Sequence, residues 1–194
     1  MHKIYHTEGL VIRGINFGEA DKYLTIYTRD FGMIRAQAQG IRKLSSKLRY
    51  SLQEFSYTDI DLVQGKDIWR ITNAKKKELF KNQINKQDVR KIVNNIFNLL
   101  ERLCHGEEKN EILFNDLVQG FFLLRQFYID KNQLDNIEFV LVLRILHHLG
   151  YLGESENLLF FINSPFTSAI LPIVSFKRKL ILSHINNALL ETQL

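Results

Sequence analysis

The spacing of apolar residues changes once along this chain, near residue 75, and that change constrains the fold more than any other feature. Before it, apolar and polar residues alternate with the period of two that is typical of strands, most clearly over residues 23–28. After it, apolar residues recur three and four positions apart, as at Val89, Ile92 and Val93, which is typical of a helix buried on one face. We therefore expect a β module followed by an α module.

Five short strands are expected in the first module, near residues 10–12, 23–28, 33–39, 52–63 and 68–72. Glycine-containing turn signals separate two pairs of them, at Arg29–Gly32 and at Gln64–Asp67. In residues 40–50 the apolar residues follow no regular spacing, and the segment is rich in Arg, Lys and Ser, which indicates an exposed loop. Five strands suit a small closed barrel. Residues 1–76 are therefore predicted to form a β-barrel domain.

The second module is predicted to be all-α over residues 77–194. Helices are expected from a cap at Asn85 to about Cys104, from Glu111 to Tyr128, from Asn136 to Leu149 and from Phe176 to Leu190. Both prolines of the chain lie within residues 151–172, where we expect an irregular connection. The fold class is thus α+β with two domains.

Positive charge is concentrated in the first module. Residues 1–80 carry 14 basic and 9 acidic side chains, whereas residues 81–194 carry 12 of each. Within residues 22–50 seven cations face the single acid Asp30. A basic stretch of this kind on an exposed loop attracts polyanions, although many charge runs are only solvated surface.

The sequence lacks the motifs of several enzyme classes. It holds no Gly-x-x-x-x-Gly-Lys phosphate loop, no Gly-x-Gly-x-x-Gly dinucleotide fingerprint and no His-Glu-x-x-His zinc motif. The single cysteine, Cys104, can form no intramolecular disulfide and reads as a buried thiol in a reducing compartment. The N-terminus lacks the apolar region of a signal peptide, and runs such as Phe139–Leu143 are far shorter than a membrane span. We expect a soluble cytoplasmic protein with no membrane segment, no cofactor and no catalytic centre.

One acidic pair keeps a metal-dependent alternative open. Asp59 and Asp61 lie two apart on one expected strand face, a spacing that can hold a divalent ion for phosphodiester cleavage. Two carboxylates without a third ligand more often pair with nearby cations, and the neighbours His147 and His148 point about 100° apart on a helix, so they cannot chelate one ion. No metal site is expected.

Residues 8–50 carry a distinctive order of motifs. An aliphatic run ends in Arg13, a Phe-Gly-Glu-Ala-Asp-Lys step spans residues 17–22, a Thr-Arg-Asp-Phe-Gly turn spans 28–32, and Ala38-Gln39-Gly40 precedes the Arg/Lys/Ser-rich loop. This order resembles the start of the RecO recombination-mediator family. Residues 52–55, 65–72, 149–151 and 184–194 also fit that family, so that the resemblance covers nearly the whole chain, most strongly over residues 8–72.

The resemblance implies an N-terminal OB-fold barrel, a C-terminal helical domain and a non-enzymatic role in DNA repair and recombination. Members of the family bind single- and double-stranded DNA, anneal complementary strands, engage the C-terminal tail of single-strand-binding protein and act with RecR to load RecA recombinase. A nucleoid-associated protein in the cytoplasm is therefore expected. Two features depart from the family. Residues 151–183 contain no cysteine, so the zinc site of many relatives should be absent, and Gln39 replaces a lysine where the basic loop begins.

An OB barrel binds single strands through cations that follow the phosphates and aromatic faces that stack on bases. The predicted DNA-binding cations all lie in the first module: Arg13, Lys22, Arg35, Arg42, Lys43, Lys47 and Arg49. The candidate stacking residues are Tyr23, Tyr27, Tyr50 and Trp69. If five phosphates are neutralised, the logarithm of the affinity should fall against the logarithm of salt with a slope of about −3.5.

The neutral helical module suits protein contacts better than a second DNA surface. By the same resemblance it would receive the tail of single-strand-binding protein in an apolar groove beside a cation, with four candidates: Arg125, Arg144, Lys177 and Arg178. Two alternatives to a mediator remain. One is a protein-binding adaptor of the same fold with weak DNA affinity, and the other is a metal-dependent nuclease built on Asp59 and Asp61.

Overall fold

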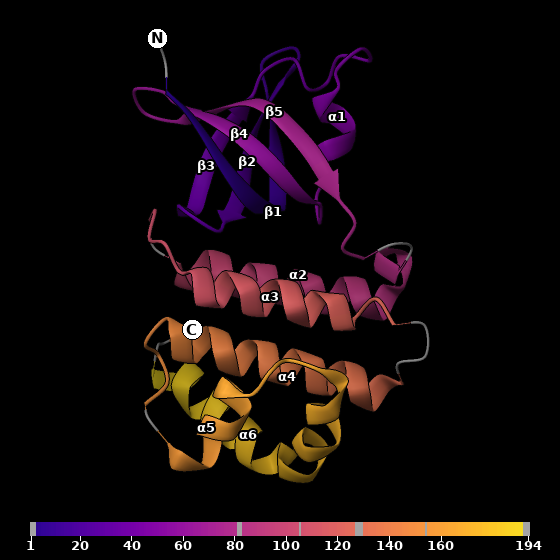
Figure 1. Cartoon of the computed structure of the whole chain (residues 1–194), viewed down its shortest axis with the longest axis vertical. Coiled ribbons are helices and arrows are strands. Elements are labelled where there is room, and N and C mark those ends of the chain that lie inside the picture. The colour runs from indigo at the N-terminus through magenta and orange to yellow at the C-terminus, as the bar shows by residue number, and fades with distance from the viewer. Residues whose placement is uncertain (1–2, 81–82, 105, 127–129, 154, 192–194) are drawn as a thin grey trace. The chain divides into compact units, whose positions relative to one another are not determined.

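The computed structural model describes residues 3–80, 83–104, 106–126, 130–153 and 155–191. The chain divides into two compact units. One consists of Met1–Leu79 with Cys104–Glu111, and the other of Phe80–Leu103 with Ile112–Leu194. The first unit holds the strands and the second holds the long helices (Figure 1). The expected architecture, an N-terminal barrel followed by helices, is confirmed.

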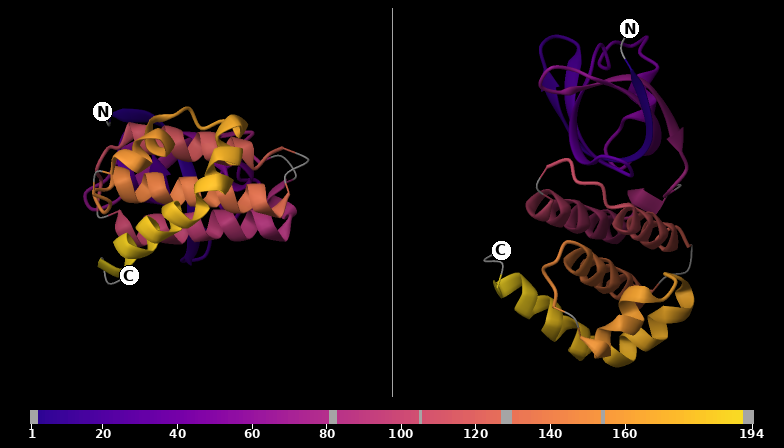
Figure 2. Two further views of the ribbon diagram at one scale, coloured as in Figure 1. Left: turned by 90° about the horizontal axis from the view of Figure 1, so that it is seen from below. Right: turned by 60° about the vertical axis from the view of Figure 1, so that its left-hand side comes forward.

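Five strands close the barrel in the order β1-β2-β3-β5-β4. Their bounds are β1 Ile4–Phe17, β2 Asp21–Thr28, β3 Gly32–Ala38, β4 Tyr57–Gln64 and β5 Trp69–Lys77. Neighbouring strands are antiparallel except for β3 and β5, which pair in parallel. The right-hand view of Figure 2 looks into the closed ring of strands. This five-stranded barrel with a crossed strand order is the OB-fold architecture.

Strand β1 is long because it serves two neighbours. Its first half pairs with β4 and its second half with β2, and the two pairings overlap at Gly9 and Leu10. The register with β2 shifts between Val11 and Arg13, a bulge that bends the strand around the barrel. A Cβ atom at Gly9 would lie only 2.7 Å from Ile26 and 2.8 Å from Ile60, so the absence of a side chain lets three strands approach closely there.

The barrel core follows from the alternation along the strands. Side chains at every second position point inward and pack together, because burial of their apolar surface stabilises the closed sheet by about 25 cal/mol per Å². The buried cluster comprises Val11, Leu24, Ile26, Ile34, Ala36, Ala38, Ile41, Leu52, Ile60, Leu62, Trp69 and Ile71.

The strand expected over residues 52–63 begins later, at Tyr57. A short helix, α1 (Leu48–Ser51), and a turn precede it. Strand β1 holds this turn, since the amide of Phe55 donates to the carbonyl of Val11 at 2.9 Å and the amide of Val11 donates to that of Ser56 at 2.8 Å. The sequence pattern places Leu52 in the strand because it is apolar, as a buried strand residue would be. It is indeed buried in the barrel core, but it reaches the core from the turn.

A segment that the sequence places between two helices, Cys104–Glu111, belongs to the barrel unit. The indole nitrogen of Trp69 donates to Glu107 at 2.8 Å, and Lys109 lies 3.3 Å from Asp30. Gly32 adopts a φ of +62° beside the backbone of Glu108, and a Cβ atom there would collide with the Glu108 carbonyl. Glycine at position 32 therefore serves both the β2–β3 turn and the seating of this segment.

Within the described residues, the helical unit contains two short 3-10 helices, η1 (Gln83–Asn85) and η2 (Ser168–Ile170), and five α-helices. These are α2 (Gln87–Leu103), α3 (Glu111–Leu123), α4 (Lys131–His148), α5 (Glu156–Asn163) and α6 (Leu171–Glu191). Helix α4 packs against α2, α5 and α6. Helix α2 buries the expected stripe, including Val89, Ile92 and Val93.

Helix bounds differ from the sequence prediction in three places. Helix α4 begins at Lys131 rather than Asn136, because Asp130 caps it by accepting a hydrogen bond from the amide of Gln133 at 2.8 Å. The expected irregular connection contains α5, and α6 begins before Pro172, which lies in the first turn where a missing N–H is tolerated. The second helix, α3, ends at Leu123 with a turn after it, and Tyr128, its expected end, lies outside the described residues.

A buried ion pair ties three helices of this unit together. Arg144 on α4 lies 2.6 Å from Asp116 on α3, and it donates to the carbonyl groups of Phe161 and Ser164 at the end of α5. His148 contacts the second oxygen of Asp116 at 2.9 Å.

Among the described residues, none of the helices is both long enough and apolar enough to cross a membrane.

Candidate nucleic-acid interface

Three of the predicted cations surround a hollow at the end of the barrel where β1 finishes and β2 begins. We call this hollow of about 550 Å³ the barrel-mouth pocket, and it is lined by Gly14, Asn16, Lys22, Leu24, Ile41, Arg42, Arg49, Leu52, Gln53 and Glu54. Lys22 comes from β2, Arg42 from the loop after β3, and Arg49 from α1. Cations that are far apart in the sequence are therefore brought together by the fold.

Asp21 fixes the start of the basic loop. Its carboxylate accepts hydrogen bonds from the amide of Gly40 and from the side chain of Gln37, both at 2.8 Å. Arg42 is then held against the β1–β2 turn, where its amide donates to Ala20 at 2.9 Å and its guanidinium to the Gly18 carbonyl at 3.1 Å. The carboxylate of Asp21 is therefore used to hold the start of the basic loop in place.

Arg13 and Arg35 lie on a different surface, the outward side of β1, β2 and β3. We call it the outer strand face and define it by Arg13, Ile15, Phe17, Tyr23 and Arg35. Arg13 and Arg35 both pair with Thr25 in register, and Ile15 pairs with Tyr23. The rings of Phe17 and Tyr23 lie 4.4 Å apart, and Ile15 and Phe17 are 61% and 47% exposed. An exposed Phe17 ring and a half-buried Tyr23 ring, on a strand face that also carries two arginines, suit base stacking with phosphate contact.

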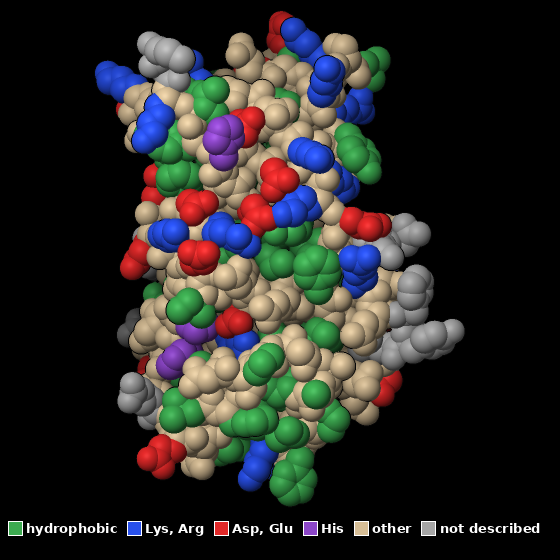
Figure 3. All heavy atoms as spheres, in the orientation of Figure 1, with side chains coloured by type: hydrophobic (Ala, Val, Ile, Leu, Met, Phe, Trp, Pro, Cys, Tyr) green, Lys and Arg blue, Asp and Glu red, His purple; other side chains and the backbone are tan. Residues whose placement is uncertain are grey.

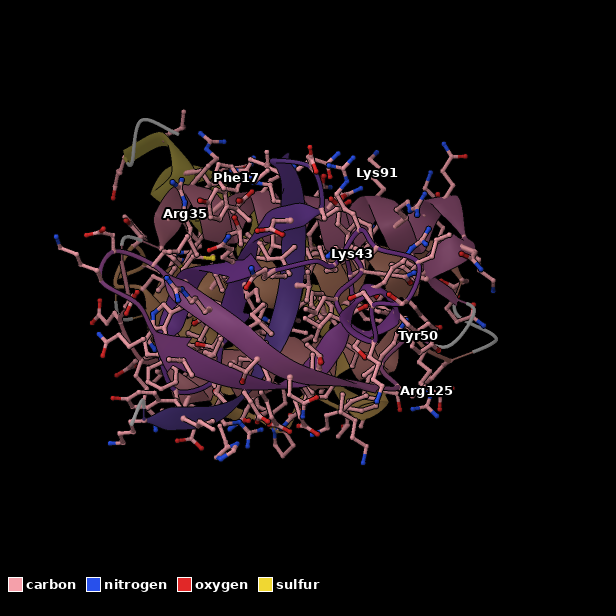
Figure 4. All side chains as sticks on the ribbon, turned by 90° about the horizontal axis from the view of Figure 1, so that it is seen from above. Phe17, Arg35, Lys43, Tyr50, Lys91 and Arg125 are labelled. Atoms are coloured by element: carbon pink, nitrogen blue, oxygen red, sulfur yellow. The ribbon has the colours of Figure 1, made fainter. Side chains whose placement is uncertain are left out.

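Lys43, Lys47 and Tyr50 form a third group on the loop and on α1, and all three are exposed. The Tyr50 ring is 67% exposed, and the Lys76 ammonium from β5 lies 4.7 Å from its centre. In Figure 4, Phe17 and Arg35 lie toward one side of the barrel and Tyr50 toward the other, with Lys43 between them. The predicted site residues therefore fall into three groups around the barrel.

Two of the four predicted stacking residues are buried, so for them the stacking prediction is wrong. Tyr27 is 1% exposed, and burial with the nearby Cys104 and Glu108 raises the pKa of its hydroxyl. Trp69 is 5% exposed, packs against Tyr5 and Phe31 at 5.4 and 4.9 Å, and donates to Glu107. Neither ring has a face open to a base, because both lie inside the barrel unit.

Sequence reasoning missed three residues of these surfaces. Ile15 and Phe17 continue the alternation of β1 beyond Arg13 on the same side, and this period was the signal that could have placed them outward. Lys76 reaches Tyr50 only because β5 returns beside α1, and no local pattern indicates that contact.

Comparison with known proteins supports the assignment of the barrel. Residues 1–80 match the family model described as the N-terminal part of recombination protein O. The DNA repair protein RecO of Alkaliphilus metalliredigens is 32% identical over 136 residues, covering 60% of this chain and 54% of that relative. RecO of Heliobacterium modesticaldum is 32% identical over 153 residues, covering 78% and 54%. These matches support the RecO family for this chain, with the family model confined to residues 1–80. The chain spans about half the length of these curated relatives.

The region matched by the RecO family model contains all seven predicted DNA-binding cations. It also contains the bulge in β1 and the loop that Asp21 shapes. The family resemblance found in the sequence motifs is therefore confirmed, and the residues that carry it include Lys22 and Arg42 at the barrel-mouth pocket and Arg13 and Phe17 on the outer strand face.

In the helical unit, the four candidate partner-binding cations differ in their surroundings. The prediction for Arg144 as an available cation is wrong, since it is 2% exposed and paired with Asp116. Arg178 lies 3.1 Å from Asp135 and stacks on Phe139. Lys177 lies 5.5 Å from the ring centre of Phe176, which is 84% exposed, and Arg125 lies 5.7 Å from that of Phe122.

Glu8 organises a charged cluster on the barrel. Burial alone would raise its pKa, but hydrogen bonds from Lys77 and Tyr57 and the charges of Lys77 and Arg29 outweigh burial, so the pKa of Glu8 lies below its ordinary value. Burial, followed by the hydrogen bond and charge of Glu8, raises the pKa of Tyr57 although Lys77 acts against it. Burial would lower the pKa of Lys77, but its bonds to Glu8 and Tyr57 raise that pKa above its ordinary value. These groups are bound to one another and act as structural ties.

Asp59 and Asp61 are engaged by other side chains. Asp59 lies 3.5 Å from Lys77, and Asp61 contacts the imidazole of His6 at 2.6 Å and the amide of Asn73 at 3.1 Å. Within the part of the chain that the structure describes, no group of three or more metal-ligating side chains comes together.

Burial, with the charge of Glu108 adding to it, raises the pKa of the Cys104 thiol to about 11, which keeps that thiol protonated near neutral pH.

Proposed function

We propose that this chain is a recombination mediator in DNA repair that binds single- and double-stranded DNA, anneals complementary strands and helps to load RecA recombinase together with RecR. The observation that carries the proposal is the gathering of Lys22, Arg42 and Arg49 at the barrel-mouth pocket of a RecO-family barrel. Phosphate contacts carry no sequence information, which suits a protein that must act on any damaged strand.

Annealing follows from the same contacts. Two single strands repel each other through their phosphates, and cations that neutralise part of this charge lower the barrier to pairing. The outer strand face adds Tyr23 and Phe17, on which bases can stack while Arg13 and Arg35 hold the backbone. No covalent step or nucleotide hydrolysis is needed, so we place the chain among binding proteins that associate with the nucleoid.

We propose further that the helical unit receives the C-terminal tail of single-strand-binding protein. Helices α5 and α6 carry exposed apolar side chains, namely Leu159, Phe160, Ile173, Phe176 and Leu190, and hydrophobic side chains are prominent on the helical part of Figure 3. Lys177 and Arg178 stand on the same helix as Phe176. An apolar acidic tail matches this combination.

A protein-binding adaptor with weak DNA affinity is the second candidate function. It is favoured by one observation, that Gln39 is exposed at the start of the basic loop and supplies no cation there. A metal-dependent nuclease is disfavoured, because a divalent ion at Asp59 and Asp61 would have to displace Lys77, His6 and Asn73 from the two carboxylates.

Three measurements on the full chain separate these functions. Labelled single strands and duplexes are titrated with the protein, the same DNA is incubated with Mg²⁺ or Mn²⁺, and the protein is co-eluted with RecR and with single-strand-binding protein. The mediator predicts DNA binding, intact DNA and co-elution. Co-elution without DNA binding would support the adaptor instead, and DNA shortening that Asp59→Asn abolishes would support the nuclease.

A further inference from the structure

The barrel-mouth pocket combines three kinds of surface that a nucleotide requires. Leu24, Ile41 and Leu52 form an apolar floor and are themselves almost fully buried. Asn16, Gln53 and Glu54 supply amide and carboxylate groups that can hydrogen-bond to the edge of a base. Lys22, Arg42 and Arg49 supply cations for a phosphate. Its volume of about 550 Å³ is within the usual range for small-molecule sites.

The cations of the pocket are positioned by the fold. Lys22 is half-buried on β2, the Arg42 guanidinium is anchored on the Gly18 carbonyl, and Arg49 is carried by α1. Glu54, whose carboxylate accepts a hydrogen bond from the amide of Gly14 at 3.2 Å, is the one acid of the lining. Three cations and one carboxylate leave the hollow net positive, and a phosphate is attracted into it.

The pocket and the outer strand face share the rim made by the β1–β2 turn. Side chains alternate between the two sides of a strand, so Asn16 and Lys22 line the pocket, whereas their neighbours Phe17 and Tyr23 lie on the outer strand face. A nucleic-acid chain that leaves the pocket over this rim meets the Phe17–Tyr23 pair next.

We propose that the barrel-mouth pocket binds one nucleotide of a single strand, with its base against the apolar floor and its phosphate at Lys22, Arg42 and Arg49. The neighbouring nucleotides then continue over the rim to the outer strand face. This inference rests on the proposed single-strand binding. It adds a discrete site, in which one nucleotide of the bound strand is enclosed by the pocket while its neighbours lie on the open strand face.

A matched pair of substitutions tests the contribution of the cations. Arg49→Gln removes a pocket cation, and Lys47→Gln removes an exposed cation two residues earlier that does not line the pocket. In a fluorescence-anisotropy titration of a dT12 strand at 0.1 M salt, Lys47→Gln should weaken binding about fivefold, and Arg49→Gln about 30-fold, because a charge-assisted hydrogen bond in a pocket is stronger than a diffuse contact. If both variants melt like the wild type and lose the same factor of affinity, the proposal that the pocket binds a nucleotide is overturned.

A second experiment locates the base. Strands of dT12 that carry one photoreactive 5-iodouridine are cross-linked to the full chain, and the modified peptide is identified by mass spectrometry. We expect cross-links at pocket-lining positions such as Asn16, Leu52, Gln53 and Glu54, and their loss in Gln53→Trp, which fills the pocket without removing a cation. Binding with cross-links at Phe17 or Tyr23 but none in the pocket would overturn this inference and leave the proposed function intact. Absence of any strand binding would overturn both.

Discussion

Reversal of two cations on the basic loop should weaken single-strand binding and flatten its dependence on salt. Arg42 and Lys47 are exposed on this loop, and the only described hydrogen bond of the Arg42 side chain goes to the Gly18 carbonyl. Loss of one hydrogen bond costs about 0.5–1.5 kcal/mol, or up to about 3 kcal/mol when one partner is charged, which is less than the free energy of unfolding of a typical domain. The double variant Arg42→Glu/Lys47→Glu should therefore still fold.

The size of the effect follows from counterion release. Each phosphate contact on a single strand changes the slope of log affinity against log salt by about 0.7, so at 0.1 M salt one contact contributes about fivefold to the affinity. If the wild type makes five contacts, its slope is about −3.5, and the loss of two contacts gives about −2.1. The affinity should fall at least about 25-fold, and more once repulsion by the new carboxylates is added.

The assay is a fluorescence-anisotropy titration of a labelled 30-mer at several salt concentrations. A matched control is Lys86→Glu/Lys91→Glu, which makes the same change in net charge at exposed positions of the helical unit. We expect this control to keep the wild-type slope. If the loop variant also keeps the wild-type slope and affinity while remaining folded, the assignment of the DNA interface to the barrel is refuted.

Three further outcomes are expected. Tyr23→Ala should weaken single-strand binding by about 1–3 kcal/mol, the value of one stacked base, while Tyr23→Phe should not, and equal binding by all three proteins in the same titration would exclude stacking there. Asp116→Asn should leave the buried Arg144 charge uncompensated and lower the free energy of unfolding by about 3–5 kcal/mol in urea, and an unchanged midpoint would contradict the role of the ion pair. The pKa of Glu8 is lower in the folded than in the unfolded chain, so its contribution to stability is complete above about pH 4.5 and is lost as the pH falls through the folded value. Glu8→Gln should remove this part of the acid dependence of the melting temperature, and an identical pH profile would refute it.

The strands and the helices were largely predictable because each buries one face, and burial on one face imposes a period on the sequence. Leu24 and Ile26 point into the barrel as their alternation predicts, and α2 buries its apolar stripe. The start of α4 was misplaced because its first three residues are polar, and the buried Leu134, three positions before Ile137, was the signal that could have extended the helix.

The site was predictable as a set of residue types but not as an arrangement. Tyr23 and Tyr27 share one side of β2, and the period of two gives no reason to separate them. Tyr27 is buried because Cys104 and Glu108, from a segment beyond α2, lie close to it, and that coverage depends on a contact between distant parts of the chain. The convergence of Lys22, Arg42 and Arg49 likewise depends on barrel closure, which no local pattern encodes.

Strand annealing by the barrel is tested by the rate at which two complementary 30-mers pair in the presence of the full chain, in EDTA and without ATP. Wild-type protein should accelerate pairing over the protein-free rate, the Arg42→Glu/Lys47→Glu variant should lose most of that acceleration, and the Lys86→Glu/Lys91→Glu control should retain it. A folded wild-type protein that does not accelerate pairing, or a loop variant that accelerates it as well as the wild type, would contradict strand annealing by the basic surface of the barrel.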